Sequence, residues 1–119
     1  MALPMKALRK TKEGPGWSLE EMLVPSASPI EVLVRVKAAS ICGTDLRVYE
    51  WDRWSAERIR PPVTLGHEFC GLVERVGREV TAVRPGDFVS AKMHINCGQC
   101  YQWRVGETLL CQKIECNRH

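Results

Sequence analysis

The chain has 119 residues and a net charge of +3, with 45% hydrophobic and 26% charged residues. This is the composition of one ordinary globular domain, and it argues against a disordered chain. No run approaches the roughly 20 apolar residues of a membrane span, and so small a positive charge does not indicate nucleic-acid binding. Residues 1–12 contain no apolar h-region. The sequence therefore predicts no signal peptide, and a cytoplasmic protein with neither a membrane nor a nucleic-acid partner.

Short strands between turns account for most of the chain. In chain order the predicted strands cover residues 5–9, 17–24, 30–39, 69–76 and 88–91. The first is expected at a sheet edge, and the third is the clearest because Val32, Val34 and Val36 recur at every second position. Gly71, inside the fourth, suggests a bulge or a close approach of two backbones. Many short strands with glycine and proline turns favour a closed or nearly closed β barrel.

The helix signal is weak and is confined to residues 44–54, where Thr44 or Asp45 could cap a short helix. No segment resembles GxGxxG, and no strand–helix–strand alternation occurs. We therefore expect no dinucleotide-binding domain within these residues.

Six cysteines are the unusual feature of the composition, and four of them lie in the last 23 residues: Cys42, Cys70, Cys97, Cys100, Cys111 and Cys116. In a reducing compartment, clustered cysteines are metal ligands more often than disulfides. A metal would also help to fix the C-terminal lobe, which carries little apolar sequence. Cys70 has apolar neighbours and is expected to be a core residue.

Three motifs occur in a fixed order between about residues 5 and 112. The first is Cys42-Gly43-Thr44-Asp45, the second is Gly66-His67-Glu68 followed by spaced glycines and a valine, and the third is Cys97-x-x-Cys100 with Cys111. A lone His–Glu pair is weak evidence, since such a pair is often only a polar strand entrance. The ordered set, however, resembles the zinc-dependent medium-chain alcohol dehydrogenase family.

This resemblance implies a mainly β, GroES-like fold: a partly open β barrel with short helices and a cysteine-rich lobe at about residues 94–116. Residues 1–119 would then form the N-terminal, catalytic domain of such an enzyme. The nicotinamide-binding Rossmann domain is absent from these residues, so NAD would be a cofactor only of an intact two-domain family member.

The resemblance also implies a catalytic zinc bound by Cys42 and His67, with Glu68 as a third or exchangeable ligand. Asp45 has the family's position for orienting the imidazole of His67. Thr44 has the position of the hydroxyl that passes the alcohol proton outward. Zinc in such a site acts as a Lewis acid that lowers the pKa of a bound alcohol.

A second, structural zinc is implied in the lobe, where the family has four cysteines spaced C-x2-C-x2-C-x7-C. Cys97, Cys100 and Cys111 match the first, second and fourth positions, but the third is Trp103, which cannot bind zinc. Three thiolates hold zinc more weakly than a closed set of four. Cys116 or Glu107 could substitute as the fourth ligand, and a metal-free, loose lobe is the other interpretation.

The segments 40–45 and 49–54 resemble the threonine dehydrogenases within that family, which implies a small alcohol or amino-acid substrate, L-threonine in particular. Tyr49, Trp51 and Trp54 could line a substrate cleft, although ordinary packing accounts for single aromatic residues. Arg47 stands where family members commonly place a relay histidine. Because arginine stays protonated, Arg47 cannot shuttle protons. It could bind a substrate carboxylate or be an ordinary solvated residue.

Two functions remain open. The chain could be the catalytic domain of a zinc-dependent, NAD-linked alcohol or threonine dehydrogenase, or a stand-alone GroES-like zinc-binding or structural remnant without turnover. Because the dinucleotide-binding motif is missing, these residues are not expected to bind NAD in the family's way. Its absence does not weaken the resemblance to the family. A zinc-ribbon module for nucleic acid is disfavoured because no basic stripe adjoins the cysteines. The sequence leaves a homo-oligomer open, and His94 is not assigned to a metal.

Overall fold

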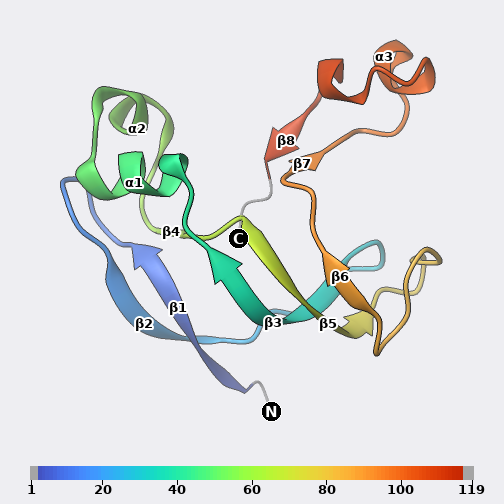
Figure 1. Cartoon of the computed structure of the whole chain (residues 1–119), viewed down its shortest axis with the longest axis horizontal. Coiled ribbons are helices and arrows are strands. Elements are labelled where there is room, and N and C mark those ends of the chain that lie inside the picture. Colours follow the sequence, from blue (N-terminus) through green and yellow to red (C-terminus); the bar gives the residue numbers. More distant parts are fainter. Residues whose placement is uncertain (1–2, 117–119) are drawn as a thin grey trace.

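The computed structural model describes residues 3–116 and consists mainly of short strands with a few short helices (Figure 1). The elements, in chain order, are β1 (Pro4–Lys10), β2 (Ser18–Leu23), β3 (Val32–Ser40), α1 (Gly43–Glu50), α2 (Arg53–Arg58), β4 (Val63–Thr64), β5 (Glu68–Val76), β6 (Phe88–Ser90), β7 (His94–Ile95), α3 (Tyr101–Arg104), the 3-10 turn η1 (Thr108–Leu110) and β8 (Glu115–Cys116). The mainly β fold class predicted from the sequence is confirmed.

The strands form three separate sheets, ordered β2-β1-β4, β3-β5-β6 and β7-β8, and every pairing in them is antiparallel. No ladder closes these sheets into a barrel within residues 3–116, so the arrangement is open. β1 was expected at an edge, and this prediction is wrong, because β1 pairs with β2 on one side and with β4 on the other. With only two residues, β4 is too short to give a strand signal in the sequence.

Gly71 lies where β3 and β5 approach each other most closely. The β3–β5 register shifts between Val36 and Ala38, beside the pairing of Val36 with Gly71. A Cβ atom at Gly71 would lie 2.3 Å from the backbone oxygen of Arg35. The bulge and the close approach expected from this glycine are therefore both present.

The single helix expected over residues 44–54 is divided into α1 and α2. Trp51 ends α1 in the left-handed conformation, at φ 57°, and Asp52 caps α2 by accepting a hydrogen bond from the Ser55 amide. The cap of α1 is Cys42, not Thr44 or Asp45 as predicted. Asp45 instead occupies the third helical position and completes a capping box.

The C-terminal end of α1 is tied to the loop after β1. Lys10, only 1% exposed, donates hydrogen bonds to the carbonyl oxygens of Gly14 and Gly16. Its ammonium also lies 4.9 Å from the ring centre of Trp51, and the Gly16 amide donates to the Tyr49 carbonyl. The buried Lys10 therefore connects this loop to the C-terminal end of α1 through hydrogen bonds and a cation–π contact.

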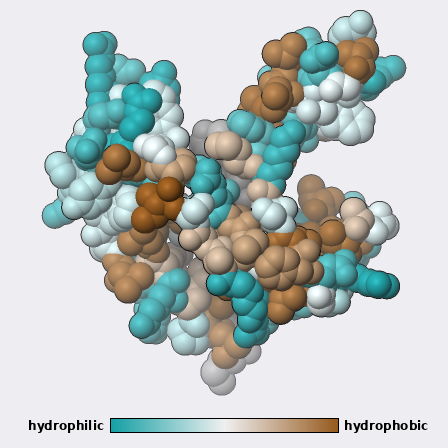
Figure 2. All heavy atoms as spheres, in the orientation of Figure 1, coloured by the Kyte–Doolittle hydropathy of each residue, from teal (hydrophilic) through white to brown (hydrophobic). Residues whose placement is uncertain are grey.

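The described residues bury few apolar side chains: Ala7, Val48, Val73 and Cys111. Many larger ones are exposed, and Figure 2 shows apolar side chains at the surface both over the sheets and on the lobe that contains α3. Local hydrogen bonds and short ladders, more than a deep core, therefore hold the side chains discussed below. None of the helices in the described part of the chain is long and apolar enough to cross a membrane.

Candidate metal centres

Cys42 and Asp45 are positioned by the N-terminus of α1. The Cys42 sulfur accepts a hydrogen bond from the Thr44 amide at 3.3 Å, and the Cys42 amide donates to Asp45 Oδ2 at 3.0 Å. Asp45 is 6% exposed. The unpaired amides of the first helical turn favour negative charge, so this is a suitable place for a thiolate and a carboxylate.

His67 meets these two side chains from the turn before β5. Its Nε2 lies 3.0 Å from the Cys42 sulfur, and its Nδ1 lies 3.7 Å from Asp45 Oδ1. Gly66, at φ 99°, makes the turn that brings His67 here, in a conformation that residues with a side chain rarely adopt. The structure thus groups Cys42, His67 and Asp45, with ligand atoms all within 4.8 Å of one another. We call these three residues the first site.

The structure places two further predicted site residues differently. Glu68 is exposed, and its Oε2 accepts a hydrogen bond from the Ser40 hydroxyl at 2.6 Å, so its carboxylate lies outside the 4.8 Å group. Thr44 contributes its backbone amide to Cys42, and its side chain is half-buried. Ser40 was missed in the sequence; its position two residues before Cys42 was the only signal.

Two hollows share the end of β3 in their lining, and one of them reaches a residue of the first site. One of about 150 Å³ is lined by Asp45 and Gly66 together with Trp17, and one of about 400 Å³ is lined by Glu68 and Cys70. Ser40 and Ala39 line both hollows. The Ser40–Glu68 hydrogen bond therefore lies at the edge of the larger hollow, and Asp45 lines only the smaller one.

Arg47 is engaged within the helical corner. Its Nε donates to Asp52 Oδ2 at 2.7 Å, and its guanidinium lies 5.1 Å from the ring centre of Trp54. The hydrogen bond from Arg47, and then that from the Ser55 amide, lower the pKa of Asp52. Of the two roles considered for Arg47, this geometry favours an ordinary surface arginine, because the side chain is 51% exposed and is paired with Asp52.

The aromatic residues near α1 pack against neighbours. Tyr49 makes an edge-to-face contact with Trp17 at 5.0 Å between ring centres, and Trp51 lies beneath Lys10. Of these, only Trp17 lines one of the two hollows. Cys70, expected in the core, is half-buried in β5.

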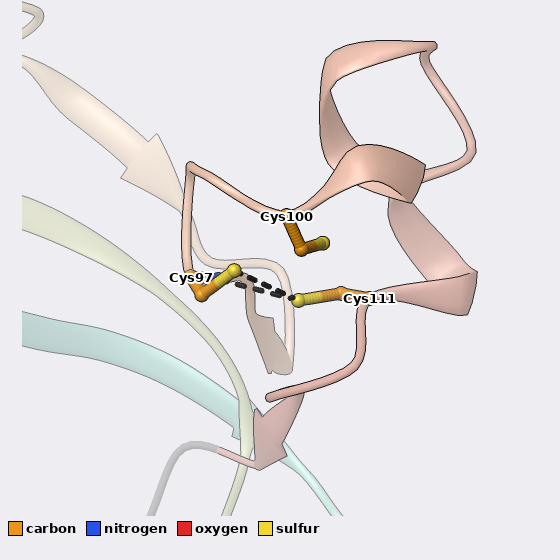
Figure 3. A group of neighbouring side chains, drawn as sticks. All are labelled: Cys97, Cys100 and Cys111. Atoms are coloured by element: carbon orange, nitrogen blue, oxygen red, sulfur yellow. Dashed lines mark hydrogen bonds between the residues drawn. The ribbon is translucent and has the colours of Figure 1, made fainter.

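The second cluster lies in the lobe, where Cys97, Cys100 and Cys111 point toward one another (Figure 3). The sulfurs all lie within 4.8 Å of one another, and those of Cys97 and Cys111 are 3.5 Å apart. The Cys97 amide donates to the Cys111 sulfur. Hydrogen bonds from the amides of Cys97 and Lys113 and from neighbouring thiols lower the pKa of Cys111 to about 7, against the opposing effect of desolvation.

Trp103 lies in α3, between Cys100 and Cys111 in the sequence. Its amide donates to the Cys100 sulfur, which caps α3, and its side chain is 42% exposed. Glu107 and His94 are not part of the three-sulfur group, and the Cys116 side chain lies outside what the structure describes. We call Cys97, Cys100 and Cys111 the lobe site.

The first site fits zinc by its donor chemistry, because thiolate, imidazole and carboxylate are the ligands that zinc takes in proteins. The lobe site offers three thiols and, among residues 3–114, whose side chains the structure describes, no fourth Cys, His, Asp or Glu within the same group. It therefore fits three of the four positions of a closed structural zinc site.

The structure is a mainly β domain with two groups of potential metal ligands, and comparison with known proteins gives its family. Residues 28–117 match the alcohol dehydrogenase GroES-like domain, and the chain belongs to that family. Over 115 residues it is 54% identical to the L-threonine 3-dehydrogenase of Symbiobacterium thermophilum, in an alignment covering 97% of this chain and 33% of the relative. The chain thus spans about a third of the length of this curated relative.

Solved structures agree with this assignment. A protein from Sinorhizobium meliloti 1021, assigned as a zinc-binding dehydrogenase and bound to NADP, aligns with a TM-score of 0.79 and 36% identity, over 97% of this chain and 32% of that one. A thermostable alcohol dehydrogenase from Pyrobaculum aerophilum, bound to cobalt and zinc, aligns with a TM-score of 0.79 and 33% identity, over 93% and 33% of the two chains.

Proposed function

We propose that this chain is the zinc-binding, catalytic part of a dehydrogenase that oxidises the secondary alcohol of a small amino-acid substrate, L-threonine or a close analogue. The observation that carries the proposal is the convergence of Cys42, His67 and Asp45, with the Cys42 sulfur 3.0 Å from His67 Nε2. Relatives named L-threonine 3-dehydrogenase support the choice of substrate.

In this proposal Cys42 and His67 Nε2 bind zinc, which polarises the substrate hydroxyl and lowers its pKa. Asp45 faces His67 Nδ1 and holds a proton there, so that Nε2 keeps its lone pair free. Asp45 also accepts a hydrogen bond from the Cys42 amide, and so holds the thiol and the imidazole in fixed positions relative to each other. Thr44 would pass the alcohol proton outward, its hydroxyl oxygen taking up that proton as the hydroxyl gives its own proton to water.

Glu68 is an exchangeable ligand in this proposal. Its carboxylate accepts the Ser40 hydroxyl at 2.6 Å and must release this bond before it can turn toward the first site. Ser40 lines both hollows. In this proposal a substrate that enters there reaches the Ser40–Glu68 hydrogen bond, which must break to release Glu68.

The hydride acceptor, NAD, binds outside residues 3–116 in this proposal. All strand pairs described there are antiparallel, whereas dinucleotide-binding folds use parallel sheets. Purified alone, the chain is therefore expected to bind zinc but to form no NADH from L-threonine and NAD.

A chimera tests the proposal. The chain replaces the N-terminal third of the Symbiobacterium thermophilum relative, and NADH formation is measured with L-threonine, with its carboxyl-amidated form and with a simple secondary alcohol. We expect activity that is lost in Cys42→Ser and His67→Asn chimeras and kept in Cys70→Ser. A folded, zinc-loaded chimera without turnover on any of these alcohols would contradict the proposal and favour the stand-alone zinc-binding domain.

A further inference from the structure

The lobe departs from a closed four-thiolate zinc site at one position. The family that the sequence resembles has a fourth cysteine at the position of residue 103, where this chain has a tryptophan that is 42% exposed. We propose that the lobe is a three-thiol site that takes a soft ion satisfied by three sulfur ligands, of which monovalent copper is the representative, in preference to zinc. The inference is independent of the catalytic role proposed for the first site.

The distances between the sulfurs suit three-coordinate binding. Three sulfurs that are each about 2.3 Å from an ion at their centre lie about 4 Å from one another. In the lobe the sulfurs of Cys97 and Cys111 are 3.5 Å apart, and no pair of sulfurs exceeds 4.8 Å. Small adjustments of these side chains therefore complete the triangle.

Backbone amides support two of the three sulfurs. The Cys111 sulfur accepts the Cys97 amide and the Cys100 sulfur accepts the Trp103 amide, at 3.4 Å in each case. Such bonds offset the negative charge that accumulates when thiolates gather around a monovalent ion. Residue 103 thus acts on the site through its backbone, while its indole supplies no ligand.

The preference follows from what each ion requires. Structural zinc is almost always four-coordinate, so zinc here must complete its shell with a water molecule or a distant group. Thiolate sites select soft ions, and monovalent copper is satisfied by sulfur alone. Without a fourth thiolate, zinc binding is therefore weaker, whereas three sulfurs still complete the coordination shell of monovalent copper.

The test is a pair of competition titrations on the whole chain in a Cys42→Ser background, which disables the first site. Copper(I) affinity is measured without oxygen against a chromogenic chelator, and zinc affinity against a zinc indicator. We expect one copper bound per chain, with three sulfur neighbours by X-ray absorption. Cys111→Ser should lower the copper affinity by about tenfold or more, whereas Cys70→Ser should not change it.

The decisive variant is Trp103→Cys, with Trp103→Phe as the control for loss of the indole. Trp103→Cys should raise zinc affinity by about tenfold or more and change copper affinity by less than about threefold. Equal gains for both ions, or no gain for zinc, would overturn the proposal. A loss of zinc or copper affinity in Cys116→Ser would also overturn it, because the chain would then supply a fourth ligand.

Discussion

The first site and the lobe site hold their sulfurs in different ways. Cys42 and Asp45 belong to a capping box, so the first turn of α1 sets their spacing and His67 is added from a neighbouring turn. In the lobe, the sulfurs of Cys97, Cys100 and Cys111 take the place of a core, surrounded by exposed apolar side chains such as Leu109 and Leu110. The first site is therefore organised around one capping box, whereas the lobe site joins a helix cap at Cys100 to sulfurs from two loops, and we expect a bound metal to stabilise it more.

Metal removal should separate the two regions most strongly. When a chelator is added to the metal-loaded chain, we expect amide exchange between residues 97 and 111 to accelerate by about a hundredfold, since bound metal stabilises by about 2.7 kcal/mol at a hundred times its Kd. Amides of α1 should change little, because the capping box does not need the metal. Hydrogen exchange by mass spectrometry measures both regions, and equal acceleration in α1 and the lobe would contradict the comparison.

Apart from the proposed zinc ligands Cys42 and His67, Asp45 should be the residue on which the first site depends most. Asp45→Ala leaves the Cys42 amide without its acceptor and should cost about 1–3 kcal/mol in the free energy of unfolding. It should also lower zinc affinity by about 10–100-fold. Asp45→Asn keeps an acceptor for the amide but not the charge, so stability should largely return while zinc affinity stays low. Urea unfolding measures the contribution of the capping hydrogen bond to stability, and zinc competition measures the contribution of the negative charge to zinc affinity.

Gly66 should matter because its backbone conformation positions His67, and not because an added side chain would clash with a neighbour. No neighbouring atom lies within 4 Å of a Cβ built there, yet φ is 99°, so Gly66→Ala should cost about 1–2 kcal/mol through backbone strain alone. Gly43→Ala is the matched control, because Gly43 has equal space and helical geometry, and should be neutral or slightly stabilising. Similar losses of unfolding free energy in both variants would count against strain.

The smallest expected effect concerns Asp52, which lies outside both sites. Its pKa is lowered in the folded state, chiefly by Arg47, so the ionised carboxylate stabilises the fold above its unfolded value of 3.8. This stabilisation is lost as the pH falls below 3.8 through the folded pKa. Asp52→Asn and Arg47→Ala should each flatten that part of the stability profile, measured as melting temperature against pH. Zinc affinity of the first site should be the same as in the unchanged chain.

The sequence predicted what depends on local pattern. The alternating valines from Val32 to Val36 identified β3, and Gly71 marked a close approach that the structure contains. The pairing of Cys42 with His67, 25 residues apart, came from the family resemblance and not from periodicity. The order of motifs therefore identified two residues that the structure places close together, but not the position of Glu68, which lies outside the group.

The remaining features depend on contacts that have no local signal. The cap of α1 was missed because cysteine is not among the usual capping residues, although its sulfur accepts the Thr44 amide. The central position of β1 depends on the two residues of β4, and the pairing of Glu68 with Ser40 joins residues 28 positions apart. Such pairings are decided by tertiary packing.

The capping box also constrains the lengths that related chains can have. Residues in an α-helix turn by about 100° each, so one residue inserted between Cys42 and Asp45 would rotate the carboxylate away from both the thiol and His67. The ten residues between Cys100 and Cys111 form two short turns instead, and length changes there can be absorbed by a surface loop. Insertions and deletions among homologues should therefore avoid the first interval and accumulate in the second.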